Sequence, residues 1–300
     1  MTEPLVVSVI LNGKRPEDIL ACLDSLAATT YPNHIELIVD YPSAAGSLEP
    51  VRAAHPEAQV IVTTENRGYA GNNNLGLNWA IAHGADWVFV LNEDTVLAPD
   101  CLSQLVAVGQ SDPHIGIVGP MVYHFDEPDV IQTAGGILGP YWLATLTGSN
   151  QRDQGQYPAP RPVEWISGCA MLVRREVINQ IGVLDERFFI YWEEIDWCLR
   201  ASRVGWRLIH VPQAKLWHKG VQRDYRPGPS VTYYTTRNHF LLLAKHHAPA
   251  RTWLALALST ARSLTSWTLK PKWRSMRPHR DAMLRGVWDF ARGRWGMRSL

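Results

Sequence analysis

The chain has 300 residues, of which 46% are hydrophobic, and its formal net charge is +1 at pH 7. This length and hydrophobic content predict a folded globular chain with a large core. No stretch reaches the ~18 uninterrupted apolar residues of a membrane-spanning helix. The first residues lack the charged leader and cleavage site of a signal peptide, so we expect a cytoplasmic protein.

Charged residues and cysteines are unevenly placed along the chain. Residues 245–300 carry twelve Lys and Arg and two acidic residues, which leaves the preceding part acidic. A basic tail of this kind is typical of a segment that meets an anionic surface. The four cysteines form no Cys-x-x-Cys pair, which predicts free thiols rather than disulfides or a zinc site.

Short apolar segments alternate with helix-like segments in the first third of the chain. The pattern predicts strands at 5–11, 36–39, 59–62 and 87–91, and helices at 16–26 and 72–82. Such alternation is typical of an α/β fold with a mostly parallel, doubly wound sheet, whose ligands bind at the carboxyl ends of the strands. Asp40 and the segment Asn92-Glu93-Asp94 each end a predicted strand and are therefore candidate ligand-binding positions.

The pattern changes after Ser111 to loops rich in Gly and Pro. A strand is then predicted at 165–173, a helix at 194–204 and a strand at 207–211, and from Tyr233 onward the sequence becomes helical, aromatic and basic. We therefore expect one large α/β domain over 1–244, made of the halves 1–110 and 111–244. A helical tail follows at 245–300.

Asp94 follows a buried predicted strand. A carboxylate in this position can hold a hard divalent cation, which would bridge the diphosphate of a nucleotide. The alternative is a turn in which Asp94 or Thr95 only caps backbone amides. Glu93 is expected to point away into solvent.

A run rich in Gly and Asn follows the third predicted strand. Gly68 and Gly71 permit a tight backbone, and Asn72, Asn73 and Asn74 lie at a predicted helix start, where free N–H groups attract anions. No Gly-Lys-Ser/Thr sequence follows, so the run is not a Walker loop, and no GxGxxG follows the first strand, which argues against a dehydrogenase. The alternative is a plain helix cap.

Two adjacent acids, Glu193 and Glu194, follow a cluster of bulky aromatic residues. Such a setting can raise a carboxyl pKa and make a general base, whereas the alternative is a helix start where acids complement the helix dipole. Asp196 and Arg200 are expected to form an ion pair, because they lie four residues apart. His218 is a candidate ligand for Mn²⁺ or Mg²⁺, although a lone His is more often an ordinary residue.

In this order, the motifs resemble those of the family 2 glycosyltransferases, which are inverting enzymes with the nucleotide-binding fold called GT-A. The resemblance extends from about Val6 to His239. The matching segments are Val7–Ile10, Cys22–Leu26, Leu37–Asp40, Asn66–Gly76, Leu91–Thr95, Ser167–Leu172, Gly182–Phe189, Glu193–Asp196 and Trp217–His218. Within the family, the chain looks most like bacterial rhamnosyltransferase-type members that build cell-surface polysaccharides.

The resemblance implies that residues 1–110 bind a nucleotide-sugar donor, either UDP- or dTDP-linked. Asp40 would bind the base, with Ser43 nearby. Asp94 would bind a divalent cation, Mg²⁺ or Mn²⁺, and His218 would complete its shell. Further donor contacts would come from Asn66, Gly68, Asn74 and Asn92.

The resemblance also implies that residues 111–244 bind the acceptor, a saccharide or a polyprenyl-linked saccharide. Glu194 would be the general base that takes the proton from the acceptor hydroxyl, with Glu193 as the alternative. Gly168 would let the acceptor approach the backbone closely, and Trp192 is a further candidate contact. The transferred sugar would be rhamnose or another hexose.

The chain departs from the family pattern at several of these positions. Asn92 stands where many members have an acid, and Glu194 stands where Asp is usual. Asp40 is followed by Tyr41-Pro42 rather than by Asn and a small residue. These departures keep open a second interpretation, a catalytically degenerate homologue that binds a saccharide or a partner without transferring a sugar.

The tail at 245–300 combines Trp and Leu residues with Lys and Arg. This composition predicts helices that lie in the headgroup layer of an anionic membrane, here the inner face of the plasma membrane, where a polyprenyl-linked acceptor would be found. Nucleic acid is the rival anion, but no motif that binds it is present. The alternative is a helical pair that packs on the domain or forms a homodimer.

Overall fold

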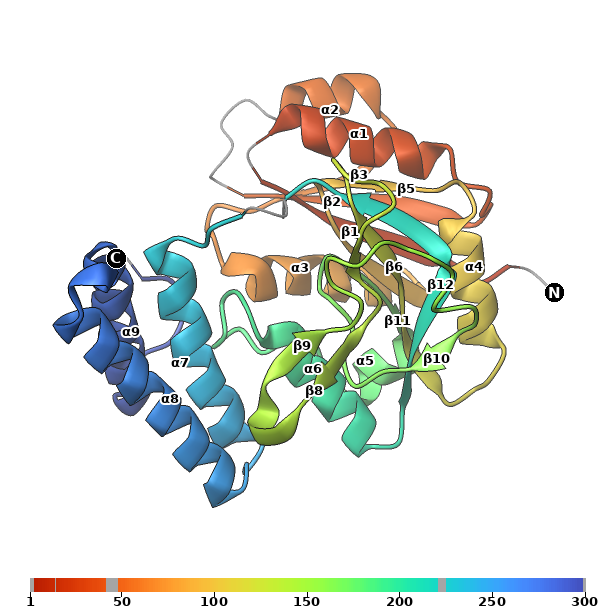
Figure 1. Cartoon of the computed structure of the whole chain (residues 1–300). Helices are drawn as coiled ribbons and strands as arrows, with labels where there is room; N and C mark the ends of the chain where they lie inside the picture. Colours follow the sequence, from red (N-terminus) through yellow and green to blue (C-terminus); the bar gives the residue numbers. More distant parts are fainter. Residues whose placement is uncertain (1–2, 14, 42–47, 221–224, 299–300) are drawn as a thin grey trace.

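The computed structural model describes residues 3–13, 15–41, 48–220 and 225–298 (Figure 1). Ser43, which was predicted to lie near the donor base, falls outside these residues. A ten-stranded sheet forms the centre of the fold. Its main path runs in the order β10 (Arg161–Pro162), β12 (Arg207–His218), β6 (Ile115–His124), β11 (Ala170–Arg174), β4 (Trp87–Asn92), β1 (Val6–Asn12), β2 (His34–Asp40) and β3 (Gln59–Val62).

The N-terminal side of the sheet is parallel. β1 pairs in parallel with β2 and with β4, and β2 pairs in parallel with β3. β11 then runs antiparallel between β4 and β6, while β12 is parallel to β6. Outside this path, β5 (Thr95–Leu97) pairs with β12, β7 (Ile131–Thr133) pairs with β6, and β8 (Gly136–Leu138) and β9 (Ala144–Leu146) form a separate hairpin. The predicted α/β class is confirmed.

Helices cover both faces of the sheet, which explains why its strands read as continuous apolar runs. Val6 and Ile10 of β1 face one core, and Val7 and Val9 of the same strand face the other. The first core also takes side chains from α1 (Pro16–Ala27), α2 (Leu48–Ala54) and α4 (Cys101–Gln110). The second takes side chains from α3 (Gly68–Ala82), α5 (Arg175–Ile181) and α6 (Glu193–Arg203). All four cysteines are buried and free, as predicted.

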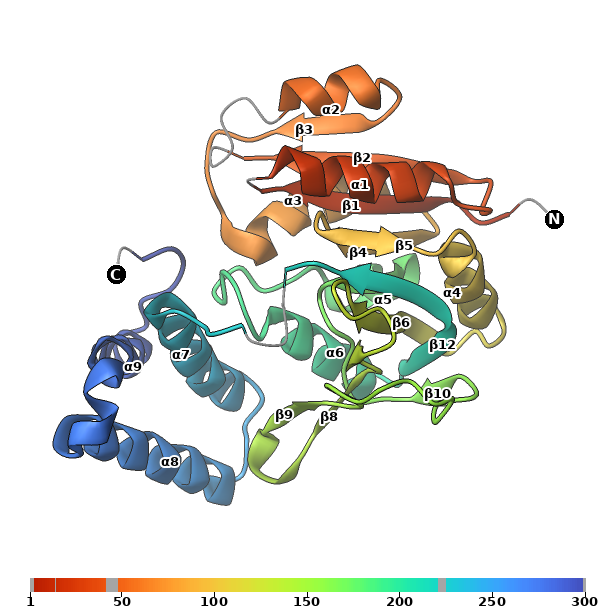
Figure 2. The same ribbon diagram turned by 45° about the horizontal axis from the view of Figure 1, so that its top comes forward.

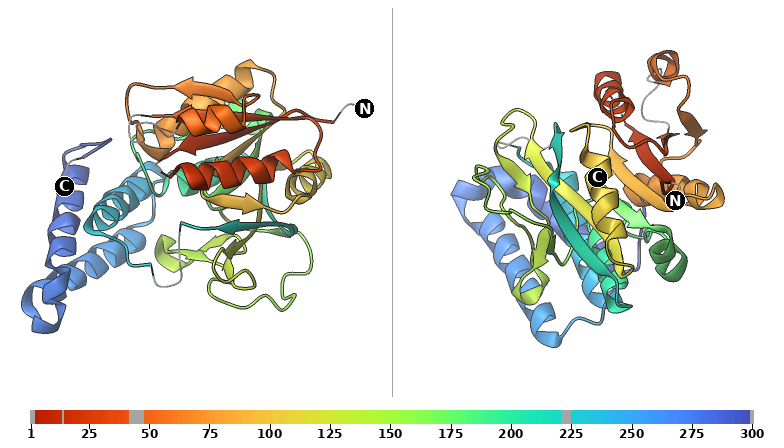
Figure 3. Two further views of the ribbon diagram at one scale, coloured as in Figure 1. Left: turned by 90° about the horizontal axis from the view of Figure 1, so that it is seen from above. Right: turned by 90° about the vertical axis from the view of Figure 1, so that its right-hand side faces the viewer.

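Three helices stand beside the α/β domain at the C-terminal end (Figures 2 and 3). These are α7 (Pro229–Lys245), α8 (Ala250–Leu269) and α9 (Arg277–Ala291), with the short 3₁₀ turn η2 (Pro271–Met276) between the last two. α7 packs against α9, and α8 contacts α9 and the turn η1 (Pro140–Trp142) at the tip of the β8–β9 hairpin. Of the helices in the described ranges, none combines the length and the apolarity that a membrane crossing requires.

The structure differs from the sequence prediction most clearly at β6. This ten-residue strand is buried along its whole length, although the sequence interpretation assigned the segment to loops. Gly116 and Gly119 interrupt the apolar run and so suggest a loop, but close packing inside the fold requires both of them. A methyl group on Gly119 would overlap Ile166, and one on Gly116 would overlap Val177. α3 also begins at Gly68, four residues before the predicted start.

Candidate active site

A cavity of about 400 Å³ lies where the ends of several strands meet. It is lined by the end of β4, the turn before β11, the start of α6 and the end of β12. Leu91 of β4 pairs with Ala170 of β11, and His218 of β12 pairs with Thr95 of β5, so the register brings these segments together. Six predicted site residues line the cavity: Asn92, Asp94, Gly168, Glu193, Glu194 and His218.

Asp94 and His218 are in direct contact on one wall of the cavity. Asp94 Oδ1 lies 3.0 Å from His218 Nε2, and the other ring nitrogen, Nδ1, lies 3.0 Å from Gln132 Oε1. Burial opposes the ionisation of Asp94, but the hydrogen bond and charge of His218 outweigh it and hold the Asp94 pKa below its usual range. Both ring nitrogens thus lie within hydrogen-bond distance of an oxygen atom, and Asn92 Nδ2 lies 3.4 Å from Nε2.

This wall provides a nitrogen and an oxygen donor of the kinds that Mn²⁺ and Mg²⁺ accept. Gln132 would fix the ring orientation, as an outer-shell partner does for a metal-bound His. Gly220 keeps the space open, because a methyl group there would overlap Asp94 Oδ2. Within the described ranges, no group of three His, Cys, Asp or Glu residues is arranged to hold a metal ion. Asp94 and His218 would therefore supply two of the ligands that a divalent cation needs.

The two carboxyl groups at the start of α6, those of Glu193 and Glu194, also line the cavity. Burial, reinforced by the charge of Glu194, raises the pKa of Glu193 well above its usual range. Burial raises the pKa of Glu194 to about 7. Oε2 of each residue is buried and accepts no hydrogen bond from the part of the chain that the structure describes. Burial thus raises the pKa of both carboxyl groups, and it raises that of Glu194 to near neutral pH.

Tyr69 of α3 and Gly168 complete the cavity floor. Tyr69 donates its hydroxyl hydrogen to the Gly168 carbonyl oxygen, and burial next to Glu193 and Glu194 raises the Tyr69 pKa well above its usual range. A methyl group on Gly168 would lie 3.0 Å from Tyr69 Oη and 3.6 Å from Glu194 Cβ. The small residue thus leaves the backbone accessible beside Glu194.

Several predicted site residues lie outside the lining of this cavity. Asp40 ends β2 and accepts a hydrogen bond of 2.6 Å from Asn12 Nδ2. Asn66 Oδ1 accepts a hydrogen bond of 2.8 Å from the backbone N–H of Gly68, the first residue of α3. Trp192 stacks on His239 at 4.2 Å between ring centroids. Donor binding by Asp40, Asn66 and Gly68 and acceptor binding by Trp192 remain predictions.

Asn74 and Glu93 make contacts that the sequence did not predict. Asn74 is buried, and its amide group makes hydrogen bonds to both the backbone N–H and the carbonyl of Leu184. It therefore fixes the segment that leads to α6, and its predicted contact with the donor gains no support from this geometry. The prediction that Glu93 points into solvent is wrong, because its carboxylate accepts a hydrogen bond from the Gly13 backbone.

The predicted ion pair between Asp196 and Arg200 is confirmed, with 2.9 Å between Oδ2 and Nε. Asp196 is fully buried and also contacts Lys245 and His246, so it anchors α6 to the end of α7. The sequence analysis gave no role to Gln132, Tyr69 or Gly220. Gly220 alone carried a local signal, its position beside His218, whereas the contacts of the other two appear only in the folded chain.

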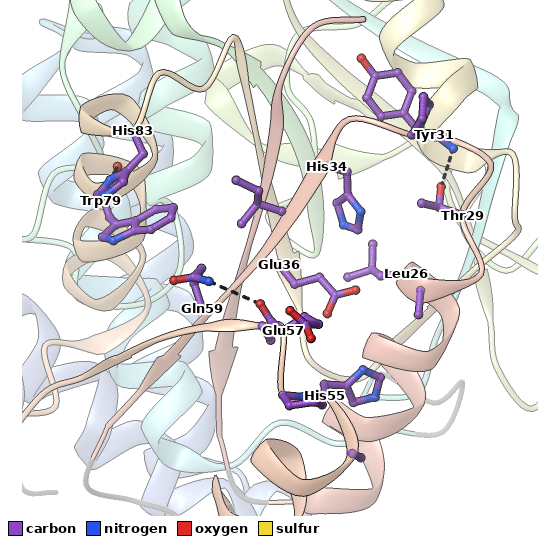
Figure 4. Close-up of a pocket in the computed structure, with 16 residues that line it drawn as sticks. Leu26, Thr29, Tyr31, His34, Glu36, His55, Glu57, Gln59, Trp79 and His83 are labelled. Atoms are coloured by element: carbon purple, nitrogen blue, oxygen red, sulfur yellow. Dashed lines mark hydrogen bonds between the residues drawn. The ribbon is translucent and has the colours of Figure 1, made fainter.

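A second cavity, of about 760 Å³, lies at the amino ends of β2 and β3, away from these residues (Figure 4). Its lining includes His34, Glu36, His55 and Trp79. Burial lowers the pKa of His34 to about 4 and raises that of Glu36. None of the predicted site residues belongs to it, and ligands of such sheets bind at the carboxyl ends of the strands. The smaller cavity is therefore the candidate active site.

Comparisons with known proteins identify the family of the chain. Residues 6–182, more than half of the chain, match the family model described as Glycosyl transferase family 2. The N-acetylglucosaminyl-diphospho-decaprenol L-rhamnosyltransferase of Mycobacterium tuberculosis is 29% identical over 265 residues, which cover 82% of this chain and 85% of that protein. The dTDP-rhamnosyl transferase RfbF of Shigella flexneri is 24% identical over 206 residues, covering 64% of this chain and 65% of that protein.

A solved structure shows the same fold. The mannosyltransferase of Pyrobaculum calidifontis in complex with GDP-Man and Mn²⁺ superposes with a TM-score of 0.58 at 16% identity, covering 97% of this chain and 88% of that one. The fold and the position of the site thus define a glycosyltransferase of GT-A architecture. The chain belongs to glycosyl transferase family 2, and the predicted family and fold are confirmed.

Proposed function

We propose that this enzyme transfers a sugar, with inversion, from a nucleoside diphosphate sugar to a hydroxyl group of a lipid-linked saccharide. One observation carries the proposal: Glu194, whose pKa burial raises to about 7, lines the same cavity as the contacting residues Asp94 and His218. A general base with a pKa near the working pH and a cation site for the leaving group are the two needs of such a displacement.

Each of these residues has a separate role in the proposed reaction. Glu194 takes the proton from the acceptor hydroxyl, which reaches it past Gly168. Asp94 and His218 hold a divalent cation, which would neutralise the charge that develops on the departing diphosphate. Glu193 is the weaker candidate for the base, because burial and the charge of Glu194 raise its pKa well above its usual range. Asp40, at the end of β2, binds the base of the donor.

The relatives suggest the chemical identity of both substrates. The names of the Mycobacterium and Shigella relatives specify rhamnosyl transfer, and the first also specifies a saccharide carried on decaprenyl diphosphate. We therefore propose dTDP-rhamnose as the donor and a polyprenyl diphosphate-linked saccharide as the acceptor. The product would serve the biosynthesis of a cell-surface polysaccharide.

The first test is the release of nucleoside diphosphate from a panel of dTDP-, UDP- and GDP-sugars with Mn²⁺ or Mg²⁺. Release from one donor, lost with chelator and in Asp94→Ala, would support the proposal. Asp129→Ala is the matched control, because Asp129 is an exposed carboxylate that pairs with Arg152 away from the cavity. If the folded enzyme released nothing from any donor, with or without a polyprenyl-linked acceptor, the degenerate homologue would replace this function.

The same function requires access to a membrane, and α8 has the surface for it. Leu254 and Leu258 are each 61% exposed, and Arg251 and Arg262 continue the same stripe of the helix. We propose that this stripe binds the headgroup layer of an anionic membrane at its cytoplasmic face. Sedimentation with phosphatidylglycerol vesicles, but not with phosphatidylcholine vesicles, should be lost when both leucines become Glu.

Val204→Glu is the control for this experiment, since Val204 is 47% exposed on the α/β domain. Sedimentation that survives the paired leucine substitution would refute the assignment to α8. If the same substitution instead dissociated a dimer in solution, the stripe would be an interface between two copies of the chain.

A further inference from the structure

The loop 188–192, directly before Glu193, has an unusual backbone. Phe189, Tyr191 and Trp192 have φ angles of 67°, 70° and 77°, in the left-handed region. This region is disfavoured for residues other than glycine, and all the more so for bulky aromatic residues. Surrounding contacts must therefore hold the loop, because the isolated chain would leave this conformation.

Two polar side chains of α7 make these contacts. Asn238 donates from Nδ2 to the carbonyl oxygens of Phe188, Ile190 and Tyr191, at 2.8, 2.8 and 2.9 Å. Arg237 donates to the Phe188 carbonyl at 2.8 Å and to Asn238 Oδ1 at 2.9 Å. Both side chains are fully buried and neither lines the candidate active site, although Asn238 contacts Ile190 and Tyr191, which do.

The contacts extend to the end of the described chain and to the opposite side of the loop. Arg237 also donates to the Gly296 carbonyl at 2.9 Å, so a segment beyond α9 helps to fix the guanidinium group. On the other side, the Ala70 backbone donates to the Phe189 carbonyl at 3.1 Å. Gly68 must lack a side chain there, because a methyl group would overlap Phe189. The loop is thus held between α3 and α7.

We propose that Arg237 and Asn238 are positioning residues, which hold the loop 188–192 and thereby place the Glu194 carboxyl group for proton transfer. The inference rests on the proposed function, in which Glu194 is the base. Both residues act through the loop carbonyls and touch no substrate. Their loss should therefore lower turnover and leave donor binding intact, because the Asp94–His218 wall belongs to other segments.

The test uses the full chain with Asn238→Ala and Arg237→Lys. Because catalysis is sensitive to misplacement by ~1 Å, we expect kcat to fall by about 10- to 100-fold, with the donor KM within about two-fold of wild type. Arg174→Lys is the matched control, since Arg174 likewise donates to backbone carbonyls, those of Ile115 and Gly109, but far from the cavity. Its kcat should stay within about two-fold of wild type at a comparable loss of stability.

A pH profile separates positioning from general destabilisation. Glu194 is faced by Glu193 on α6, Tyr69 on α3, Cys169 before β11 and Cys198 on α6. A loosened loop would admit water to this group, so the acidic limb of kcat should move to lower pH in both α7 variants. The limb of Arg174→Lys should coincide with that of wild type.

Hydrogen exchange of the amides at 188–194 gives a readout that does not depend on activity. Exchange should rise in the α7 variants and stay unchanged in Arg174→Lys, with Mn²⁺ and nucleoside diphosphate binding as the check on folding. Unchanged exchange, or faster exchange with an unaltered kcat and pH limb, would overturn the positioning role. The wild type could instead be inactive while exchange in the loop still rises in the α7 variants. That result would overturn the proposed function and leave Arg237 and Asn238 with a structural role alone.

Discussion

Replacement of Glu194 by Gln should abolish most activity and make the protein more stable at alkaline pH. Burial raises the folded-state pKa of this carboxyl from 4.5 to about 7. Each pKa unit corresponds to ~1.4 kcal/mol, so keeping Glu194 ionised in the fold costs about 3 kcal/mol above pH 8. Because the folded pKa is raised, this cost is absent below the unfolded pKa of 4.5, develops as the pH rises from there to about 7, and is constant at higher pH. The cost at pH 5 is below about 1 kcal/mol.

The assay compares urea unfolding of Glu194→Gln and wild type at pH 5 and pH 8, beside turnover of the donor. We expect the variant to gain about 2 kcal/mol more at pH 8 than at pH 5, and its kcat to fall by about 10²- to 10⁴-fold. Glu57→Gln, at an exposed position, should show no such pH-dependent gain. The acidic limb of kcat/KM in wild type should have its midpoint near 7.

Two results would refute this reasoning. If the acidic limb of kcat/KM were unchanged in Glu194→Gln, another group would be the base. Glu193→Gln would then be the variant that loses activity. Equal stability changes at pH 5 and pH 8 would show that Glu194 ionises in the fold without penalty. The burial that we derive for its carboxyl group would then be wrong.

Further predictions concern the Asp94–His218 wall. Gly220→Ala should lower Mn²⁺-dependent turnover by about ten-fold or more, because the added methyl group overlaps Asp94 Oδ2. Gly228→Ala, where the structure leaves open space, should have no effect in the same assay. Gln132→Leu removes the hydrogen bond to His218 Nδ1 and should weaken Mn²⁺ affinity about 10- to 100-fold in a titration. An unchanged affinity would show that Gln132 does not orient the His218 ring.

The strands that carry the donor half could be predicted because they are apolar runs bounded by clear breaks. β3 has the predicted limits, Gln59–Val62, and β4 extends the predicted segment by one residue. β6 could not be predicted, because Gly116 and Gly119 interrupt its apolar pattern. These glycines fit side chains from other parts of the chain, Val177 and Ile166, which the local sequence does not contain.

The same division applies to the site. Asp94, Glu194 and His218 could be chosen as candidates, because each belongs to a short motif whose residue types match a chemical task, and the structure places all three in the lining of one cavity. Gln132 could not, since its contact with His218 spans 86 residues and depends on the pairing of β7 and β12 with β6. The donor contact of Asn74, suggested by its place in an Asn-rich run, remains a prediction. The hydrogen bonds of its amide group to Leu184 could not be predicted, because Leu184 lies 110 residues away along the chain.

The position of Glu194 explains how a longer side chain than Asp can serve in this site. The carboxyl group of a Glu lies about one methylene further from the backbone, so its placement depends more on where α6 begins. That start is set by the three left-handed residues before it, and α3 and α7 hold these from both sides. The loop therefore has the contacts to compensate for the added length. An Asp at position 194 would restore the family pattern, but in this backbone it should reach less far into the cavity and be the slower enzyme.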